Sequence, residues 1–214
     1  MTRMMSNITN CRILVFAKAP IPGEVKTRLL PSMDALAVTD LHEKLVLHAL
    51  NTAVESKVGL VELWCTPSVD HPFFIQCENK LQIELHQQTA GDLGRRMAHA
   101  FGEALKRVPM VLLMGSDCPS LTCEDLKEAT RSLGQGSQAV ISPAEDGGYV
   151  LIGLRQYERS LFEGISWGTN SVFEETRQRL RQLGWNWQEL PPRWDVDRPE
   201  DVERLRRERL MEWN

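Results

Sequence analysis

The chain has 214 residues, of which 42% are hydrophobic and 25% are charged, and its formal net charge is −4. This length and apolar content predict one domain, covering residues 1–214, with a substantial core. The acidic balance argues against nucleic acid or an anionic membrane as the main partner, because both require a basic surface. The N-terminal segment has no apolar signal core, and "ILVFA" at 13–17 is far shorter than the roughly 20 residues of a membrane span. We therefore expect a soluble, cytoplasmic protein.

The five cysteines, at positions 11, 65, 77, 118 and 123, include no C-x-x-C pair. An odd number does not suit a disulfide-bridged secreted domain. Cys118 and Cys123 could ligate a metal together with a histidine, but no second pair lies at zinc spacing. We predict reduced thiols in or near the core.

Short apolar runs alternate with longer segments of helical period, which predicts an α/β fold, a Rossmann-like three-layer αβα sandwich with a mostly parallel, mixed sheet. The predicted strands, in chain order, span residues 12–17, 59–65, 81–86, 110–115, 138–142 and 149–154. Predicted helices span 36–55, 92–108 and 125–133, a further helix runs from about 171 to a stop at Gly184, and a last helix starts at Pro199.

Ligands of open α/β sheets bind beyond the carboxyl ends of the strands. Four chemically unusual stretches lie at such places: "KAPIPGEVKTRL" after the first strand, "GSDCPSL" after the fourth, "PAEDGGY" before the sixth and "RWDVDRPED" before the last helix. We therefore take the candidate site residues from these four stretches.

The first stretch is a loop that presents two cations. Prolines at 20 and 22, followed by Gly23, end the strand, so Lys26 and Arg28 are displayed beyond it. Arginine offers a planar fork and lysine a point charge, a pair that could chelate a diphosphate; the alternative is a solvated basic turn. A Walker P-loop is excluded, because Val25 stands where the glycine before the lysine is needed.

The second and fourth stretches supply carboxylates. Asp117 directly follows an apolar strand, where it could hold a hard cation against phosphate oxygens. It could instead cap the following helix, although Ser120 and Thr122 already suit that role. Asp195 and Asp197 project to the same side of an extended segment. One of them could complete the metal site and the other could cap the last helix; the pattern leaves the assignment open.

The third stretch places two carboxylates before a glycine turn. Glu145 and Asp146 precede Gly147 and Gly148, which let backbone approach a ligand closely. A carboxylate there could act as general base on an acceptor hydroxyl. The alternative is an ordinary acidic β-turn.

Six motifs, in order, span nearly the whole chain: "KAPIPGEVKTRL" at 18–29, "DLGRRM" at 92–97, "GSDCP" at 115–119, "PAEDGGYVLIGL" at 143–154, "WGT" at 167–169 and "DVDRPEDV" at 195–202. Together they resemble the GT-A-like glycosyltransferases of the selenodomain-associated or arsenosugar-biosynthesis type. That family is similar in turn to the molybdenum-cofactor and phospholactate nucleotidyltransferases. The stretch "QQTAG" at 87–91 stands where the family usually has glycines.

The resemblance implies a nucleotide-diphospho-sugar transferase-like fold, a nucleotide or nucleotide-sugar partner, a small-molecule acceptor and Mg²⁺ or Mn²⁺ as cofactor. By position, it implies nucleotide or phosphate contacts from Lys18, Gly23, Lys26, Arg28 and Gln88. It implies a metal at Asp117, assisted by Asp195 or Asp197, and catalysis by Asp146 with Glu145. The acceptor side would be formed by Gly147, Gly148, Tyr149, Trp167 and Thr169.

Three functions remain open at this point. A metal-dependent glycosyltransferase would release a nucleoside diphosphate from a nucleotide sugar, and a nucleotidyltransferase would release pyrophosphate from a nucleoside triphosphate. A nucleotide-binding protein without catalysis is the third. The first loop contains prolines where a triphosphate loop is rich in glycine, so it has fewer N–H donors for a triphosphate. This favours the glycosyltransferase.

Overall fold

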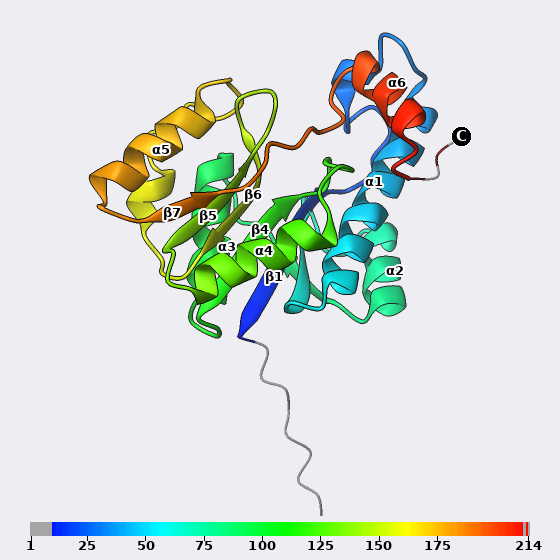
Figure 1. Ribbon diagram of the computed structural model, residues 1–214. Helices are drawn as coiled ribbons and strands as arrows, with labels where there is room; N and C mark the ends of the chain where they lie inside the picture. Colours follow the sequence, from blue (N-terminus) through cyan, green and yellow to red (C-terminus); the bar gives the residue numbers. More distant parts are fainter. Residues whose placement is uncertain (1–9, 212, 214) are drawn as a thin grey trace, which may run out of the picture.

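The computed structural model describes residues 10–211 and 213, so most of the N-terminal segment interpreted above lies outside the described residues. The described strands form a seven-stranded sheet in the order β3-β2-β1-β4-β6-β5-β7 (Figure 1). β6 is antiparallel to β4 and β5, and the other neighbouring strands pair in parallel. The strands are β1 (Cys11–Lys18), β2 (Leu60–Thr66), β3 (Glu84–Gln87), β4 (Met110–Gly115), β5 (Ala139–Pro143), β6 (Tyr149–Leu154) and β7 (Trp187–Glu189).

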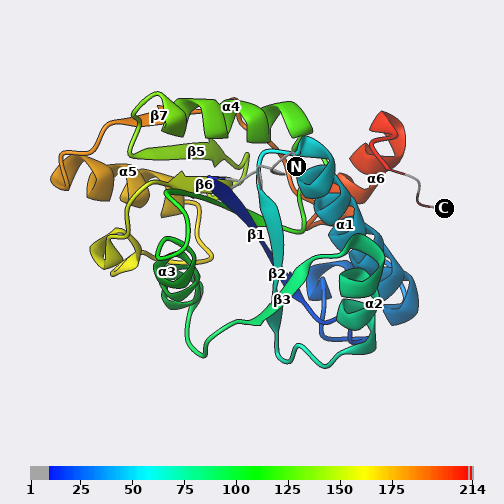
Figure 2. The ribbon, with the colours of Figure 1, turned by 90° about the horizontal axis from the view of Figure 1, so that it is seen from below.

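Helices cover both faces of the sheet, which confirms the predicted three-layer α/β fold (Figure 2). One face carries α1 (Ala35–Ser56), α2 (Pro72–Leu81) and α4 (Cys123–Gly134). The other carries α3 (Leu93–Ala104), the 3-10 helix η2 (Arg159–Phe162) and α5 (Val172–Gln182). The last helix, α6 (Pro199–Glu208), packs with the 3-10 helix η1 (Thr27–Leu29) against the first half of α1.

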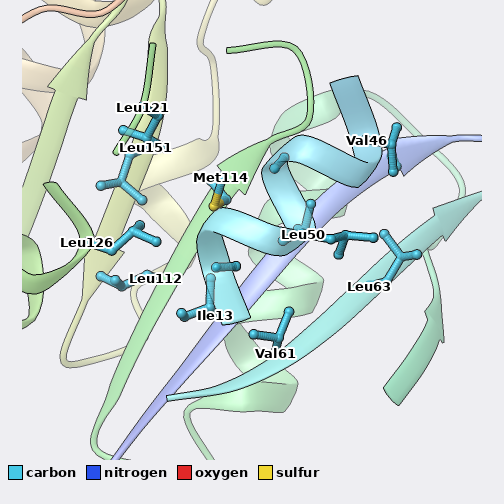
Figure 3. Close-up of a cluster of buried hydrophobic side chains, with 14 of the residues drawn as sticks. Ile13, Val46, Leu50, Val61, Leu63, Leu112, Met114, Leu121, Leu126 and Leu151 are labelled. Atoms are coloured by element: carbon cyan, nitrogen blue, oxygen red, sulfur yellow. The ribbon is translucent and has the colours of Figure 1, made fainter. Parts of the chain in front are cut away.

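The central strands are buried on both faces, as expected for parallel strands between two helical layers. Successive side chains of β1 alternate, so Ile13 and Val15 join the core under α1 and α4 while Leu14 and Phe16 join the core under α3. Figure 3 shows the first of these cores, where Leu50 of α1 contacts residues of the sheet. All five cysteines are free thiols within the described residues, and four are buried.

A third apolar cluster holds the first loop in place. Leu29 from η1 packs with Leu41 and Leu45 of α1, and Trp194, Val196 and Leu205 from the C-terminal part complete it. This cluster fixes the loop that contains Lys26 and Arg28 against the segment that contains Asp195 and Asp197. Two stretches that are far apart in the sequence therefore form one unit beside the sheet.

Several elements differ from the sequence-based expectation, among them the helix predicted over 92–108, which ends at Ala104. The predicted strand 81–86 is wrong at its start, because residues up to Leu81 belong to α2 and the strand begins at Glu84. Gln82 adopts a left-handed conformation (φ 54°) that ends the helix between the two. Neither α2 nor β7 was expected. α2 has a histidine, His71, as its N-cap, which is not among the usual capping residues, and β7 has three residues.

In the described part of the chain, no helix combines the length and the apolar character that crossing a membrane requires.

Candidate active site

The four predicted stretches meet at one edge of the sheet. The parallel strands β1, β4 and β5 end at this edge, and β6 begins there. After β7 the chain crosses the same edge on its way to α6 (Figure 1). The N–H of Arg193 donates to Pro143 O (2.9 Å), and the N–H of Val196 donates to Asp117 O (2.8 Å). Because β2 and β4 flank β1 on opposite sides, the edge between β1 and β4 is the topological switch point where such folds bind ligands.

Lys26 and Asp117 form an ion pair at this switch point. The Lys26 Nζ lies 2.9 Å from Asp117 Oδ2 and donates to Val196 O at 2.5 Å, and its side chain is 3% exposed. Burial raises the pKa of Asp117, but opposing contributions, the largest of them the charge of Lys26, outweigh burial and hold that pKa below its ordinary value. Thr122, not Asp117, caps α4, since its side chain accepts from Asp125 N. Asp117 is therefore not used as a cap, and its side chain is 45% exposed at this edge of the sheet.

The negative charges of two other carboxylates act on Asp195. Burial, followed by the negative charges of Asp146 and Asp117, raises the pKa of Asp195 to about 6. Three carboxylates from three different loops thus repel one another at this edge, with the ammonium of Lys26 as an opposing charge. A bound divalent cation would relieve this repulsion, and oxygen donors are what Mg²⁺ and Mn²⁺ accept. These oxygen donors match the predicted cation in type, but among the described residues only Glu62, Glu84 and His86 bring three ligand atoms within 4.8 Å of one another.

Asp197 has a different neighbour from Asp195. Its carboxylate forms an ion pair with Arg28, whose side chain is 63% exposed. Neither aspartate caps α6: Asp201 does so, by accepting from the N–H groups of Asp197 (3.0 Å) and Arg198 (2.7 Å). The structure therefore separates the two aspartates that the sequence left equivalent.

The two carboxylates of the acidic turn, Glu145 and Asp146, have different partners. Asp146 is exposed, and its Oδ1 accepts from Gly148 N at 2.9 Å. Gly147 has a φ of 93°, and a side chain there would collide with the backbone of Asn170, so glycine is required. Glu145 instead pairs with Arg204 of α6, at 2.7 and 3.2 Å. Asp146 remains at the edge with Asp195, whereas Glu145 is engaged by α6.

The remaining residues predicted on the nucleotide side differ in exposure and in hydrogen bonding. Lys18 is about half exposed and donates to Glu24 O at 2.8 Å. Gly23 has a φ of 80° with open space beside it, as a loop around a ligand needs. Gln88, in contrast, is buried, and its amide donates to Trp64 O at 2.7 Å. That amide group is therefore already bonded to the backbone of β2.

The predicted acceptor-side residues are half-buried, except Thr169, which is exposed. The Tyr149 hydroxyl contacts Met97 Sδ (3.9 Å), and burial raises the pKa of Tyr149. Its ring packs edge-on against Trp167, and Trp167 packs in turn on Gly94 of α3, where no side chain would fit. Thr169 is exposed and donates to Ser166 O at 2.8 Å. Tyr149 and Trp167 are thus half-buried and pack against the core under α3, and Thr169 is exposed on the same side of the acidic turn.

Sequence reasoning missed His42 of α1, whose side chain lies beside Asp117. Its Nε2 bonds to Lys18 O at 2.8 Å, and its Nδ1 faces Asp117 Oδ1 at 3.9 Å. Burial lowers the pKa of His42, more than the charge of Asp117 raises it, so the neutral ring is favoured. The sequence signal was weak, because His42 adjoins the apolar stripe of the first helix and is in none of the four unusual stretches.

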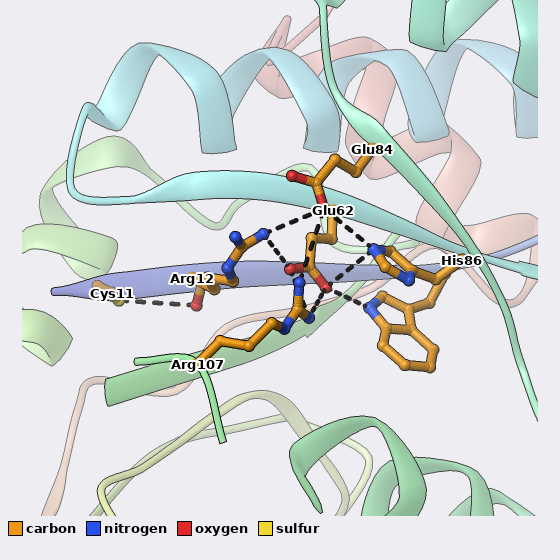
Figure 4. A network of polar contacts seen from close by, with 7 residues as sticks. Cys11, Arg12, Glu62, Glu84, His86 and Arg107 are labelled. Atoms are coloured by element: carbon orange, nitrogen blue, oxygen red, sulfur yellow. Dashed lines mark hydrogen bonds and ion pairs between the residues drawn. The ribbon is translucent and has the colours of Figure 1, made fainter. Parts of the chain in front are cut away.

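A second group of metal-ligating side chains lies elsewhere on the sheet. Among the residues that the structure describes, Glu62, Glu84 and His86 bring ligand atoms within 4.8 Å of one another. The same carboxylates already accept from Arg12 and Arg107, and Glu62 is fully buried between them (Figure 4). Two guanidinium groups in contact with the carboxylates oppose a divalent ion, so this group is a buried ion-pair network.

A cavity of about 530 Å³ lies along α3, lined in part by Arg95, His99, Tyr157 and Phe162. None of the predicted site residues lines it. It is therefore a separate feature from the edge between β1 and β4.

Comparisons with known proteins agree with this fold. A family model described as "Uncharacterized protein conserved in bacteria (DUF2064)" matches residues 49–169. The chain is 33% identical to a Desulfovibrio desulfuricans G20 protein assigned as a nucleotide-diphospho-sugar transferase; the match covers 89% of this chain and 84% of that one, with a TM-score of 0.81. A search of the curated proteins found no match.

More distant structures share the fold at low sequence identity. One is CMP:2-keto-3-deoxy-manno-octonic acid synthetase in complex with CTP (13% identity, TM-score 0.59, covering 94% of this chain and 98% of that one). Another is 4-diphosphocytidyl-2C-methyl-D-erythritol synthase from Anaerococcus prevotii DSM 20548 (11% identity, TM-score 0.61, covering 94% and 96%). At these identities the likeness concerns the fold alone.

Proposed function

We propose that this chain, which belongs to the DUF2064 family of bacterial proteins, is a metal-dependent transferase that uses a nucleoside diphosphate sugar as donor and a small molecule as acceptor. The observation that carries the proposal is the convergence of Lys26, Asp117 and Asp195 at the edge between β1 and β4. A cationic loop and a carboxylate cluster from remote parts of the chain meet at the place where α/β folds bind nucleotides.

The first loop would bind the diphosphate of the donor. Lys26 is fixed by Asp117 and Val196, so its ammonium is positioned before any ligand arrives. Arg28 is exposed and, among the described residues, pairs only with the half-exposed carboxylate of Asp197, a weak interaction in water. A diphosphate can therefore compete with Asp197 for Arg28, and a guanidinium binds phosphate oxygens in a bidentate manner. Lys18 lies at the start of the same loop.

Asp117 and Asp195 would hold the divalent ion. When bound, that ion would offset negative charge on the leaving nucleoside diphosphate. Lys26 and Arg28 add two further positive charges close to the same leaving group, which stabilises the charge that develops there.

Asp146 would orient the acceptor and take its proton. Its carboxylate is exposed at the edge, held by the N–H of Gly148, and close enough to Asp195 to raise that residue's pKa. A carboxylate so placed can accept the proton of an attacking hydroxyl group. Trp167 and Thr169 lie beside this turn and would form the wall of the acceptor side.

The test is a screen of nucleoside diphosphate sugars with Mg²⁺ or Mn²⁺, read as thermal stabilisation and as release of the nucleoside diphosphate. Asp117→Asn should abolish the metal-dependent stabilisation. Asp146→Asn should keep donor binding within about twofold and lower turnover by 10²-fold or more. No stabilisation by any donor would contradict the proposal, and unchanged turnover in Asp146→Asn would remove that residue from catalysis.

The same screen covers the two other functions. Nucleoside triphosphates with sugar phosphates are included, because the fold also occurs in CTP-using synthetases. Release of pyrophosphate instead of nucleoside diphosphate would assign nucleotidyl transfer. Metal-dependent nucleotide binding with no product in any assay would assign a binding protein without catalysis.

A further inference from the structure

His42 is a buried histidine whose tautomer is determined by its surroundings. Its side chain is 5% exposed, and its Nε2 lies 2.8 Å from Lys18 O. Because a carbonyl oxygen can only accept, Nε2 is the nitrogen that carries the proton. In the neutral ring, Nδ1 then presents a lone pair.

That lone pair faces another acceptor. Asp117 Oδ1 lies 3.9 Å from His42 Nδ1. Both atoms have less than 1 Å² of exposed surface, and no donor among the described residues bonds to either one. Asp117 uses its other oxygen, Oδ2, for Lys26. Two buried acceptors that face each other carry a cost, because neither has replaced its lost hydrogen bonds to water.

The separation of the two acceptors suits a shared cation. Metal–nitrogen and metal–oxygen bonds of small divalent ions are about 2.0–2.2 Å long. Two ligands of one ion are therefore about 3 Å apart when they meet it at a right angle, and about 4.2 Å apart when they lie opposite each other. The observed 3.9 Å falls in this range. It is too long for a direct hydrogen bond.

We propose that His42 Nδ1 is a direct ligand of the divalent ion that Asp117 holds, and that this nitrogen makes the site select a first-row transition ion such as Mn²⁺ or Fe²⁺ over Mg²⁺. The inference rests on the proposed metal-dependent function and specifies its cation. Imidazole nitrogen suits transition ions, whereas Mg²⁺ takes oxygen ligands.

The carbonyl of Lys18 orients the ring, since a hydrogen bond to the far nitrogen of a ligating histidine fixes its tautomer. Lys18 also opens the cationic loop. The same hydrogen bond therefore ties the metal ligand on α1 to the start of the loop that would bind phosphate.

The test is pulsed electron paramagnetic resonance of the full chain loaded with Mn²⁺ alone, which detects a directly bound ¹⁴N nucleus. The main variant is His42→Gln, because the glutamine amide can still donate to Lys18 O but has no nitrogen at the Nδ1 position. His48→Gln is the matched control: His48 is on the same helix and its Nε2 bonds to Pro119 O at 3.2 Å. His86→Gln tests the group around Glu62 as an alternative Mn²⁺ site.

We expect nitrogen coupling in the wild type, in His48→Gln and in His86→Gln, and no coupling in His42→Gln. The affinity for Mn²⁺ should fall at least about tenfold in His42→Gln, and the affinity for Mg²⁺ should fall less, so the preference for Mn²⁺ narrows. If His42→Gln does not fold, single variants of the other four histidines assign the coupling by elimination. A coupling that survives all four belongs to His42.

The outcomes separate this inference from the proposed function. Mn²⁺ binding that depends on Asp117 but shows no nitrogen coupling overturns the role of His42 and leaves the metal-dependent transferase standing. Mn²⁺ binding that is unchanged in Asp117→Asn overturns both. Loss of the coupling in His86→Gln places the ion in the Glu62 group and also overturns the inference.

Discussion

Asp195 and Asp197 are two residues apart and have opposite surroundings. Asp195 lies near Asp117 and Asp146 and has its pKa raised to about 6, whereas Asp197 pairs with the exposed Arg28. We predict that Asp195→Asn weakens Mn²⁺ binding about tenfold or more, because it would remove one of the proposed ligands. Asp197→Asn should leave Mn²⁺ binding within about twofold. Calorimetric titration of both variants with Mn²⁺ measures the difference.

The same pair makes a prediction about the nucleotide. Removing the charge of Asp197 frees Arg28 for phosphate, so Asp197→Asn should bind a nucleoside diphosphate several-fold more tightly than the wild type in the presence of Mn²⁺. Arg28→Ala should bind it more weakly. Weaker binding in Asp197→Asn would mean that this aspartate is itself a ligand of the metal or of the nucleotide.

At the residue scale the sequence predicted which residues gather but not how they pair. The positions of Lys26 and Asp117 after the first and fourth predicted strands followed from the pattern of strand, proline and glycine. That Glu145 pairs with Arg204, or that the Gln88 amide bonds to the end of β2, depends on contacts between residues more than 20 positions apart. Periodicity and local motifs contain no information on such contacts.

The segment between β7 and α6 has little regular structure of its own, and Arg193 holds it in place. Its guanidinium donates to Asp125 of α4 at 2.6 and 3.0 Å, one residue before Trp194 enters the third apolar cluster. Burial raises the pKa of Asp125, but hydrogen bonds from Arg193 and Thr122 outweigh burial and leave the pKa below its ordinary value. The ion pair between Arg193 and Asp125 of α4 therefore helps to position Asp195.

We predict that Asp125→Asn lowers the free energy of unfolding at pH 7 by about 2 kcal/mol, the scale of a charged hydrogen bond. A carboxyl whose pKa is depressed in the folded state stabilises it above the ordinary value of about 3.9 and loses that contribution as the pH falls through the folded value. The difference in the free energy of unfolding between wild type and variant should therefore disappear below pH 4. Urea unfolding of both proteins from pH 7 to pH 3 measures it; a constant gap would contradict the assigned cause.

The elements that the sequence predicted well are those with strong periodicity and clear ends. β4 and β6 match their predicted bounds of 110–115 and 149–154, and α1 differs by one residue at each end. α2 was missed although Pro72 stands in its first turn, because its N-cap His71 is not a usual capping residue and its buried residues Phe73, Phe74 and Cys77 span little more than one turn. β7 was missed because three residues cannot display a period.

At the scale of the whole molecule, two groups of charged residues lie at opposite ends of β1. Arg12 lies near the amino end of β1, in the network around Glu62, whereas the candidate active site lies beyond the carboxyl end of the same strand. The network has two arginines on one buried carboxylate, which Trp64 also contacts through its indole N–H (3.1 Å). Its role is to stabilise the fold.

We predict that Glu62→Gln lowers the free energy of unfolding by about 3 kcal/mol, because it leaves two guanidinium groups without their buried counter-charge. Mn²⁺ binding should remain within about twofold, because the site is at the other end of β1. Chemical denaturation and a Mn²⁺ titration of this variant test the two statements together. A loss of Mn²⁺ binding in a folded Glu62→Gln protein would move the metal site to this network.

The overall topology explains why a sequence with no recognisable phosphate loop could still reveal its candidate site. Parallel strands end at one edge, so the stretches that follow β1, β4 and β5 must lie together wherever the sheet forms. The segment after β7 crosses the same edge because tertiary contacts in the cluster of Leu29, Trp194 and Val196 hold it there. No local sequence pattern predicts this crossing.

The most direct test of the account is calorimetry of a nucleoside diphosphate sugar binding to the wild type and to Asp117→Asn, each with and without Mn²⁺. The account predicts that Mn²⁺ strengthens donor binding to the wild type at least tenfold and has no effect on the variant. Donor binding that is equally strong with and without Mn²⁺ in both proteins would contradict it.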